Sequence, residues 1–140
     1  MRYVLDSSVA ICWVIPRPLS PKALLLRDEC RQQIHELIAP SVFPHEIASA
    51  LTKSERQKLI PVGDARPLSR DVLSTSPVLH GTGPIFYRAI DISSQTRSGF
   101  YDCLYVALAE WEGIEFVTTD DKLLKNLQAR FPFVISLASL

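Results

Sequence analysis

Short apolar runs rich in β-branched residues alternate along the chain with longer stretches of helical periodicity. Short strands that alternate with helices form right-handed crossovers, which produce a parallel sheet. The sequence therefore predicts one α/β domain over residues 1–140, with a mainly parallel central sheet. The expected strands cover residues 3–5, 37–39, a short stretch within 76–84, 114–119 and 134–135.

Helices are expected between these strands. Ser20 and Pro21 are typical of a helix start, because serine caps the first turn and proline fits the first helical position. Pro44 is tolerated only in the first turn of the helix that contains it. The expected helices cover residues 9–15, 20–33, 41–59, 64–73, 84–95, 101–112 and 122–131.

Composition limits the class of protein. A chain of 140 residues with 47% hydrophobic and 21% charged residues fits one soluble globular domain. The net charge of +0 argues against a strongly basic surface that coats nucleic acid, although a local basic stripe is compatible with it. Cys12, Cys30 and Cys103 are an odd number, so no disulfide framework is expected and a cytoplasmic location is predicted. The apolar run 9–15 is too short for a membrane span.

Acidic residues occupy the ends of elements that meet at one edge of such a sheet. Asp6 directly follows the first strand, and Asp120 and Asp121 directly follow the fourth. Asp102 lies at the start of the sixth helix and Glu46 in the first turns of the third. Ligands of open parallel sheets bind outside the carboxyl ends of the strands, where these helices also begin. The topology therefore predicts that these acids converge at one edge.

Each acid also has a purely structural interpretation. An acid in a first helical turn stabilises the helix dipole by about 0.3–1 kcal/mol, which alone would account for Asp102 or Glu46. Asp6 is harder to explain in this way, because an acid that ends a buried strand needs a partner. Taken together, the acids favour a functional site.

Four segments resemble the acidic blocks of PIN-domain nucleases, and most closely those of the VapC-type toxins of toxin–antitoxin pairs. The segments are, in chain order, YVLDSSVAICW, APSVFPHEIASAL, YDCLYVALAE and FVTTDDKLL. The resemblance runs from residue 3 to residue 124, and YDCLYVALAE is its most specific piece. It implies an α/β/α sandwich with Mg²⁺ (or Mn²⁺) bound by Asp6, Glu46, Asp102 and Asp120.

The resemblance also implies an RNA substrate, a small antitoxin partner and a homodimer, with no membrane association. One position departs from the pattern, because related proteins often carry asparagine where this chain has Ser49. The central segment 62–83 carries little of the family's signature.

The residue types fit the hydrolysis of an RNA phosphodiester. Uncompensated carboxylates would repel the phosphate and raise one another's pKa values. Mg²⁺ or Mn²⁺ takes hard oxygen ligands, bridges phosphate oxygens and lowers the pKa of bound water. Metal-activated water is therefore the expected attacking group. Asp6 and Asp102 are expected as central ligands, and Glu46 and Asp120 as the ligands that complete the first or second shell.

Several neighbours are expected to support this site. Thr118 and either Ser7 or Ser8 are predicted to orient a carboxylate or water, although a helix cap explains the serines at least equally well. Asp120 is expected to serve the metal and Asp121 to cap the last helix.

Some of the cations have alternative interpretations. Arg97 is the first choice for a contact with a substrate phosphate. A solvated face is favoured over an RNA-binding stripe for the cluster of Lys53, Arg56 and Lys58.

Other side chains with potential chemistry are expected to be structural. No two histidines have the spacing of a metal site, so surface or loop positions are predicted for all of them, with His45 as a distant candidate for the site because it adjoins Glu46. The remaining cysteine and tryptophan side chains are predicted to pack in the core. The residues concerned are His35, His45, His80, Cys12, Cys103, Trp13 and Trp111.

Other functions are compatible with parts of the pattern. Haloacid-dehalogenase-like phosphatases need a second aspartate two positions after the first, where this chain has Ser8. Receiver domains need a lysine after the final strand, and the terminal VISLASL has none. A PIN fold that only binds RNA or protein, without catalysis, is the remaining alternative.

Overall fold

Five strands form one sheet in which every neighbouring pair is parallel. The computed structural model describes all residues from 1 to 140. The strand order is β3-β2-β1-β4-β5, so β1 lies at the centre, where Val4 pairs with Ile38 on one side and Phe116 on the other. The predicted α/β class and parallel sheet are confirmed. The strands are β1 (Arg2–Leu5), β2 (Glu36–Pro40), β3 (Val78–His80), β4 (Glu115–Thr118) and β5 (Val134–Ser136).

All of the expected helices are present, but several of their ends differ from the prediction. The first helix begins at Ser7 rather than at residue 9, because Asp6 already occupies the capping position. The last helix ends at Leu127 rather than at residue 131, because the chain turns there ahead of Pro132. The helices are α1 (Ser7–Ile11), α2 (Ser20–Arg31), α3 (Phe43–Arg56), α4 (Ala65–Leu73), α5 (Phe86–Thr96), α6 (Phe100–Glu112) and α7 (Asp121–Leu127), with short 3-10 turns at Gly83–Ile85 and Leu137–Ser139.

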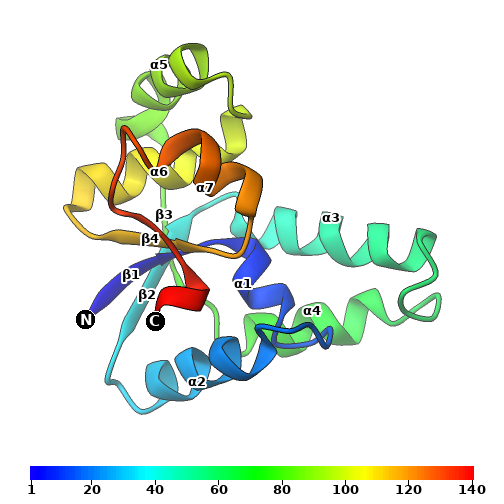
Figure 1. The fold of residues 1–140 in the computed structure, drawn as a ribbon. Helices are drawn as coiled ribbons and strands as arrows, with labels where there is room; N and C mark the ends of the chain where they lie inside the picture. The colour runs from blue at the N-terminus through cyan, green and yellow to red at the C-terminus, as the bar shows by residue number, and fades with distance from the viewer.

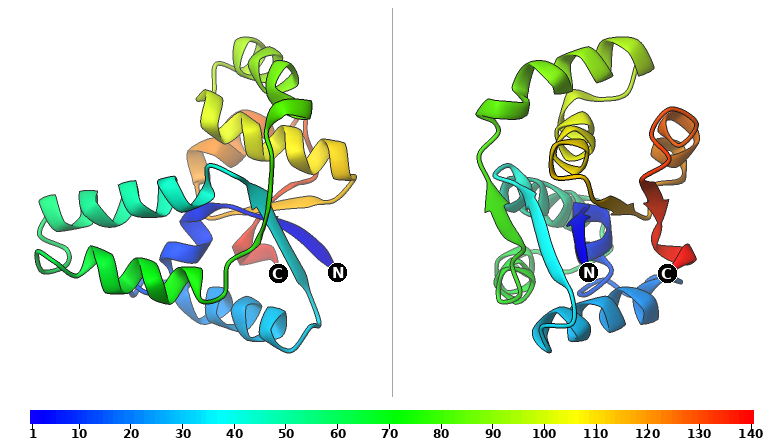
Figure 2. Two further views of the ribbon diagram at one scale, coloured as in Figure 1. Left: turned by 180° about the vertical axis from the view of Figure 1, so that it is seen from behind. Right: turned by 90° about the vertical axis from the view of Figure 1, so that its left-hand side faces the viewer.

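Helices cover both faces of the sheet. Figure 1 shows α5, α6 and α7 on one side and α1, α2 and α4 on the other. The helix α6 packs against β1, β2 and β4, and α5 covers its outer surface. Burial on several sides explains why Cys103–Ala109 of α6 is apolar on every face. Figure 2 shows that the antiparallel pair α3 and α4 extends beyond the sheet.

Most of the packing predictions hold, with one exception. Trp13, Cys12 and Cys103 are buried as expected. Trp111 was expected in the core, but it is 67% exposed because it lies in the last turn of α6. None of the helices has both the length and the apolar character that crossing a membrane requires.

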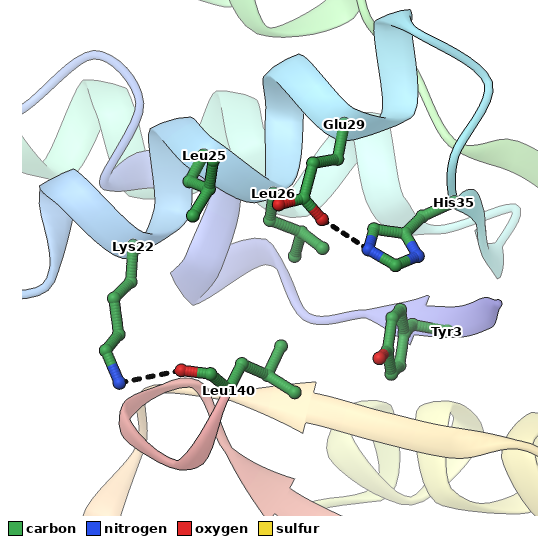
Figure 3. A pocket seen from close by; sticks show the side chains of 7 residues that line it. All are labelled: Tyr3, Lys22, Leu25, Leu26, Glu29, His35 and Leu140. Carbon is green, nitrogen blue, oxygen red and sulfur yellow. Dashed lines mark hydrogen bonds and ion pairs between the residues drawn. The ribbon is translucent and has the colours of Figure 1, made fainter.

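A small cavity of about 200 Å³ lies between α2 and the sheet, beside Tyr3 of β1 and the last residue of the chain, Leu140 (Figure 3). His35 forms a hydrogen bond with Glu29 there, and its ring meets the ring of Tyr3 edge-on at 5.4 Å. His35 therefore lies in a turn, as predicted, but its side chain is packed rather than free in solvent. His80 is half-buried beside Glu112, and only His45 is exposed.

The carboxyl ends of the strands form one edge of the sheet. Because all of the strands are parallel, β1 and β4 both end there, and α3 and α6 both begin there (Figure 1). This edge therefore receives the residues that follow β1 and β4 together with the first turns of two helices.

Candidate active site

Asp6 is a buried carboxylate held by hydroxyl groups. It follows β1, and its backbone N–H donates to the carbonyl of Val117 at 3.1 Å, which fixes it to β4. Its Oδ2 accepts hydrogen bonds from Thr118 Oγ1 at 2.6 Å and from Ser8 Oγ at 2.7 Å. Only 5% of Asp6 is exposed, and no cation forms an ion pair with it. The hydroxyls of Ser8 and Thr118 therefore orient this carboxylate, whereas Ser7 acts on it only through its backbone N–H.

The same hydroxyls connect Asp6 to the loop that carries Asp120. Ser8 Oγ accepts the N–H of Thr119 at 3.1 Å, and Thr118 Oγ1 accepts the N–H of Asp120 at 3.0 Å. The position of Asp120 is therefore tied to that of Asp6, although the two residues lie far apart in the sequence.

Asp120, rather than Asp121, caps α7. Asp120 Oδ1 accepts the backbone N–H of Leu123 at 3.1 Å, and Asp121 is the first helical residue. The predicted capping role of Asp121 is therefore wrong. The physical reason is that a capping side chain reaches the amides two or three positions ahead from extended backbone, which Asp120 provides.

Glu46 and Asp102 approach this edge from the first turns of α3 and α6. Glu46 Oε1 is buried without a hydrogen-bond partner, and so is the hydroxyl of Tyr105 on α6. The Tyr105 hydroxyl is near enough to favour the charged form of Glu46, but the two groups form no hydrogen bond of normal geometry. Neither Glu46 nor Asp102 takes part in an ion pair.

The pKa values show that the acids share one environment. Burial raises the pKa of Glu46 to about 7, and the charges of Asp6 and Asp102 add to the effect. Burial likewise raises the pKa of Asp102 to about 6, with further contributions from Asp6 and Asp120. The pKa of Asp6 is also raised, chiefly by burial, although its hydroxyl partners oppose the shift. Such coupling requires the four carboxyls to lie near one another.

Two cavities meet at these acids. The larger, of about 400 Å³, is lined by Asp6, Asp102 and Asp120. The smaller, of about 250 Å³, is lined by Asp102 and Asp120 again. Glu46 lines neither cavity, although it lies near Asp6, Asp102 and Tyr105. Asp121 also lines neither.

The donor chemistry of this edge fits a hard divalent cation. The groups are carboxylate and hydroxyl oxygens, and the buried Glu46 Oε1 has no partner of its own. No three side chains among histidine, cysteine, aspartate and glutamate are close enough to hold one metal ion together. Repulsion between like charges opposes a closer approach of the carboxyls. The acids converge as predicted, but they do not form a closed ligand cage.

Several residues at the site were missed or undervalued by sequence reasoning. Lys53, expected on a solvated face, lines the larger cavity together with Arg17. The signal was present, because Lys53 follows Glu46 by seven positions and helix residues at that spacing share a face. Tyr105 likewise follows Asp102 by three positions on α6.

Arg97 lines the smaller cavity, as its predicted role requires, together with Lys122. Arg56 lines neither cavity, and Lys58 lies on a different hollow of the surface.

Comparison with known protein families gives a match to the PIN domain over residues 3–129. This chain belongs to the PIN-domain family. Proteins with PIN domains are generally nucleases. The matched range includes all four of the acids that converge at the carboxyl edge of the sheet.

Two solved structures share the fold of this PIN domain. The crystal structure of PAE2754 from Pyrobaculum aerophilum matches with a TM-score of 0.73 at 21% identity, over 99% of this chain and 85% of that one. The crystal structure of VapBC2 from Rickettsia felis, bound to a DNA fragment from their promoter, matches with a TM-score of 0.63 at 16% identity, over 97% of each chain. Among curated proteins, none matches the sequence significantly.

Proposed function

We propose that this PIN domain is a metal-dependent endoribonuclease that hydrolyses RNA phosphodiester bonds with water as the nucleophile. The observation that carries the proposal is a group of mutually coupled acids without cationic partners, at the edge of the sheet where α/β domains bind ligands. Buried carboxylates that are neither paired nor neutralised are costly, and a bound cation would remove that cost.

Asp6 and Asp102 are proposed as the central ligands of Mg²⁺ or Mn²⁺, with Glu46 and Asp120 completing the first or second shell. A bound divalent ion supplies Lewis-acid stabilisation of the phosphate and lowers the pKa of water. Ser8 and Thr118 hold the Asp6 carboxylate in one orientation. The hydrogen bond from Leu123 to Asp120 Oδ1 limits the rotation of Asp120 and leaves its other oxygen available. No protein nucleophile is required.

The biological role proposed is that of a VapC-type toxin with a small antitoxin partner. The fold likeness to VapBC2, a pair that was crystallised with DNA from its promoter, supports this role. Three free cysteines are compatible with a cytoplasmic protein. The proposed toxin role is independent of the catalytic proposal, since either can fail alone.

A homodimer is also proposed. A row of aromatic rings lies on α5 and the start of α6, where Phe86 contacts Tyr87 and Phe100, and Phe100 contacts Tyr101. Tyr87 is 76% exposed and Tyr101 is 58% exposed. A second copy of the chain would cover this apolar surface, and large exposed apolar patches mark such interfaces.

The catalytic proposal is tested with Asp102→Asn, which removes the charge but keeps the shape of the side chain. RNA cleavage in Mn²⁺ should fall by at least about 100-fold, and the melting temperature should be unchanged or higher because carboxyl repulsion is relieved. Asp91→Asn, at an exposed acid of α5, is the matched control and should retain full activity. Undiminished cleavage by Asp102→Asn would refute the proposed site. Absence of RNA cleavage by the wild-type protein with either metal ion would leave the non-catalytic binding module as the better interpretation.

A further inference from the structure

We propose that the cavity between α2 and the sheet, here called the α2 cavity, binds a small organic cation: a primary ammonium group on a short aliphatic stem. The ammonium group contacts the Glu29 carboxylate and the Tyr3 ring, and the stem lies against leucine side chains. None of the residues that line the α2 cavity borders the cavities at the acids. The inference is therefore independent of the proposed nuclease function.

The α2 cavity has polar groups at its ends and apolar walls between them. Figure 3 shows Glu29 and His35 at one end and Lys22 at the other. Two leucines of α2 lie between them on one side, and the ring of Tyr3 from β1 lies on the other (Figure 3). A ligand with a charged end and an apolar body matches this arrangement.

The Glu29 carboxylate has an oxygen that lacks a donor. Its Oε2 is bonded to Nε2 of His35, whereas its Oε1 accepts no hydrogen bond from the protein. Glu29 forms no ion pair with a lysine or an arginine. The side chain extends from α2 toward the space between this helix and β1 (Figure 3). A free carboxylate oxygen there favours a ligand that donates, and a charged donor forms the stronger hydrogen bond.

The electrostatic field at the Tyr3 wall is negative. Burial raises the pKa of the Tyr3 phenol, and the charges of Glu115 and Glu29 raise it further. The only lysine or arginine on the walls is Lys22, and its Nζ already donates to two backbone carbonyl oxygens near the C-terminus. The α2 cavity therefore favours a cation over an anion.

Tyr3 supplies an aromatic ring and an oxygen that is only weakly engaged. It is 5% exposed, and its hydroxyl donates to the sulfur of Met1 at 3.6 Å, which is a weak acceptor. The lone pairs of the hydroxyl oxygen remain available to an ammonium N–H. Attraction between a cation and the face of an aromatic ring adds to the attraction of the carboxylate.

The size of the α2 cavity limits the ligand to a small amine. Its volume of about 200 Å³ equals the space of roughly seven water molecules in the liquid. Sites for drug-sized ligands measure about 300–1,000 Å³. Leu25, Leu26 and Leu140 complete the walls with apolar carbon, which suits an aliphatic stem. A metal ion fits poorly, because it needs several oxygen ligands and these walls offer one carboxylate.

The test uses butylammonium as the probe. It is titrated into the isotopically labelled protein at about pH 7.5, where histidine is mostly neutral, and the amide signals in NMR spectra report both affinity and location. The amides of Leu26 and Glu29 should shift to saturation with a Kd of about 1 mM. The amides of Asp102 and Asp120 report binding to the active-site acids separately. 1-Butanol, which has the same stem without the charge, should bind at least about tenfold more weakly.

Two variants disrupt the α2 cavity in different ways. Glu29→Gln keeps the size of the side chain and its contact with His35, and should weaken butylammonium binding at least about tenfold. Leu25→Lys, at a 58% exposed position four residues before Glu29, supplies an ammonium group from the protein itself and should block binding. Asp28→Asn, at an exposed acid of α2 outside the cavity, is the matched control and should change the Kd by less than about twofold. Melting temperatures check the folding of each variant.

A second probe distinguishes a free amine from a lysine side chain of another protein. Nα-acetyl-lysine N-methylamide carries the same ammonium group and stem with peptide groups attached. Tighter binding than that of butylammonium would support the proposal with a protein lysine as the ligand. Weaker binding would support it with a free amine.

Four results would overturn the inference. They are equal binding of 1-butanol and butylammonium, undiminished binding by Glu29→Gln, undiminished binding by Leu25→Lys, and no saturation by butylammonium well above the expected Kd. Amide shifts confined to the surroundings of Asp102 and Asp120 would also overturn it, because the amine would then bind only the active-site acids.

Discussion

Asp6 owes its orientation to two hydroxyl groups, and Thr118 is the better one to remove. Its Oγ1 donates to Asp6 and accepts the amide of Asp120, so it joins the two acids. Thr118→Val keeps the shape of this fully buried side chain and deletes both hydrogen bonds. Cleavage should fall by about 10–100-fold, the usual effect of losing a group that orients a metal ligand. Thr118→Ser keeps the hydroxyl, and an equally large loss in that variant would contradict an orienting role.

The adjacent aspartates at 120 and 121 should differ in function. Asp120→Asn should abolish cleavage with little effect on the melting temperature, because asparagine caps a helix about as well as aspartate. Asp121→Asn should retain most of the activity, since Asp121 lines neither cavity. Cleavage rates and melting curves of both variants check this assignment. An inactive Asp121→Asn beside an active Asp120→Asn would mean that the two roles are exchanged.

At the scale of single elements, Glu46 in the first turn of α3 and Asp102 in the first turn of α6 should make the stability of the metal-free protein depend on pH. Burial raises the pKa of Glu46 from 4.5 to about 7, so the folded state keeps a proton that the unfolded chain has already lost. The stability linked to this proton is present in full below the unfolded pKa and is lost as the pH rises through the folded pKa. Asp102, with a pKa of about 6, acts in the same direction.

The melting temperature in EDTA should therefore fall between about pH 5 and about pH 8. Glu46→Gln should reduce this fall, because it removes one of the raised acids. Added Mn²⁺ should restore stability at the higher pH, because a ligand that binds only the folded state stabilises it. A melting temperature that rises with pH in EDTA would contradict the raised pKa values.

Arg27 joins α2 to α4 away from the site. It is 4% exposed, donates to Asp71 and Thr75, and stacks on the ring of Trp13 at 4.7 Å. Arg27→Ala should lower the free energy of unfolding by about 2–3 kcal/mol through lost packing and hydrogen bonds, a moderate value because Asp71 remains half exposed to water.

Arg31→Ala is the control for this change, because Arg31 donates to the same Thr75 hydroxyl from an exposed position. It should cost less than about 0.5 kcal/mol. Urea denaturation measures both variants, and equal effects would show that the burial of Arg27 contributes nothing.

Periodicity and turn chemistry predicted every helix and strand, and the order of the strands along the chain implied the parallel sheet. The ends of α1 and α7 were less predictable, because local backbone hydrogen bonds decide the helix start directly after Asp6 and the turn before Pro132. The exposure of Trp111 was also not predicted. The helical spacing of the apolar residues in α6 does not show how far along this helix the core packing extends.

At the scale of the whole molecule, topology alone predicted that the acids converge. The sequence also indicated Thr118 and a serine after Asp6 as orienting hydroxyls, but it did not distinguish Ser8 from Ser7. It did not predict that Glu46 lines neither cavity, because this depends on the side-chain rotamer. The sequence also favoured a solvated face for Lys53. In the structure, Lys53 is part of the site because the exposed face of α3 borders the larger cavity.

Self-association should depend on the aromatic row of α5. Tyr87→Lys places a charge in the middle of the proposed dimer face and should convert dimer to monomer at micromolar concentration. Trp111→Lys alters an aromatic residue of similar exposure outside that row and should leave the dimer intact. Light scattering distinguishes the two outcomes. A dimer that persists in Tyr87→Lys but dissociates in Trp111→Lys would place the interface elsewhere.

Metal dependence of RNA cleavage by the wild-type protein is the most direct test of the proposed activity. A single-stranded RNA is incubated with protein that has been stripped of metal, then with Mg²⁺ or Mn²⁺, and finally with excess EDTA. The coupled, unpaired acids predict no cleavage in the stripped protein, cleavage when either ion is added, and complete arrest by EDTA. Cleavage that continues at full rate in EDTA would contradict the proposal.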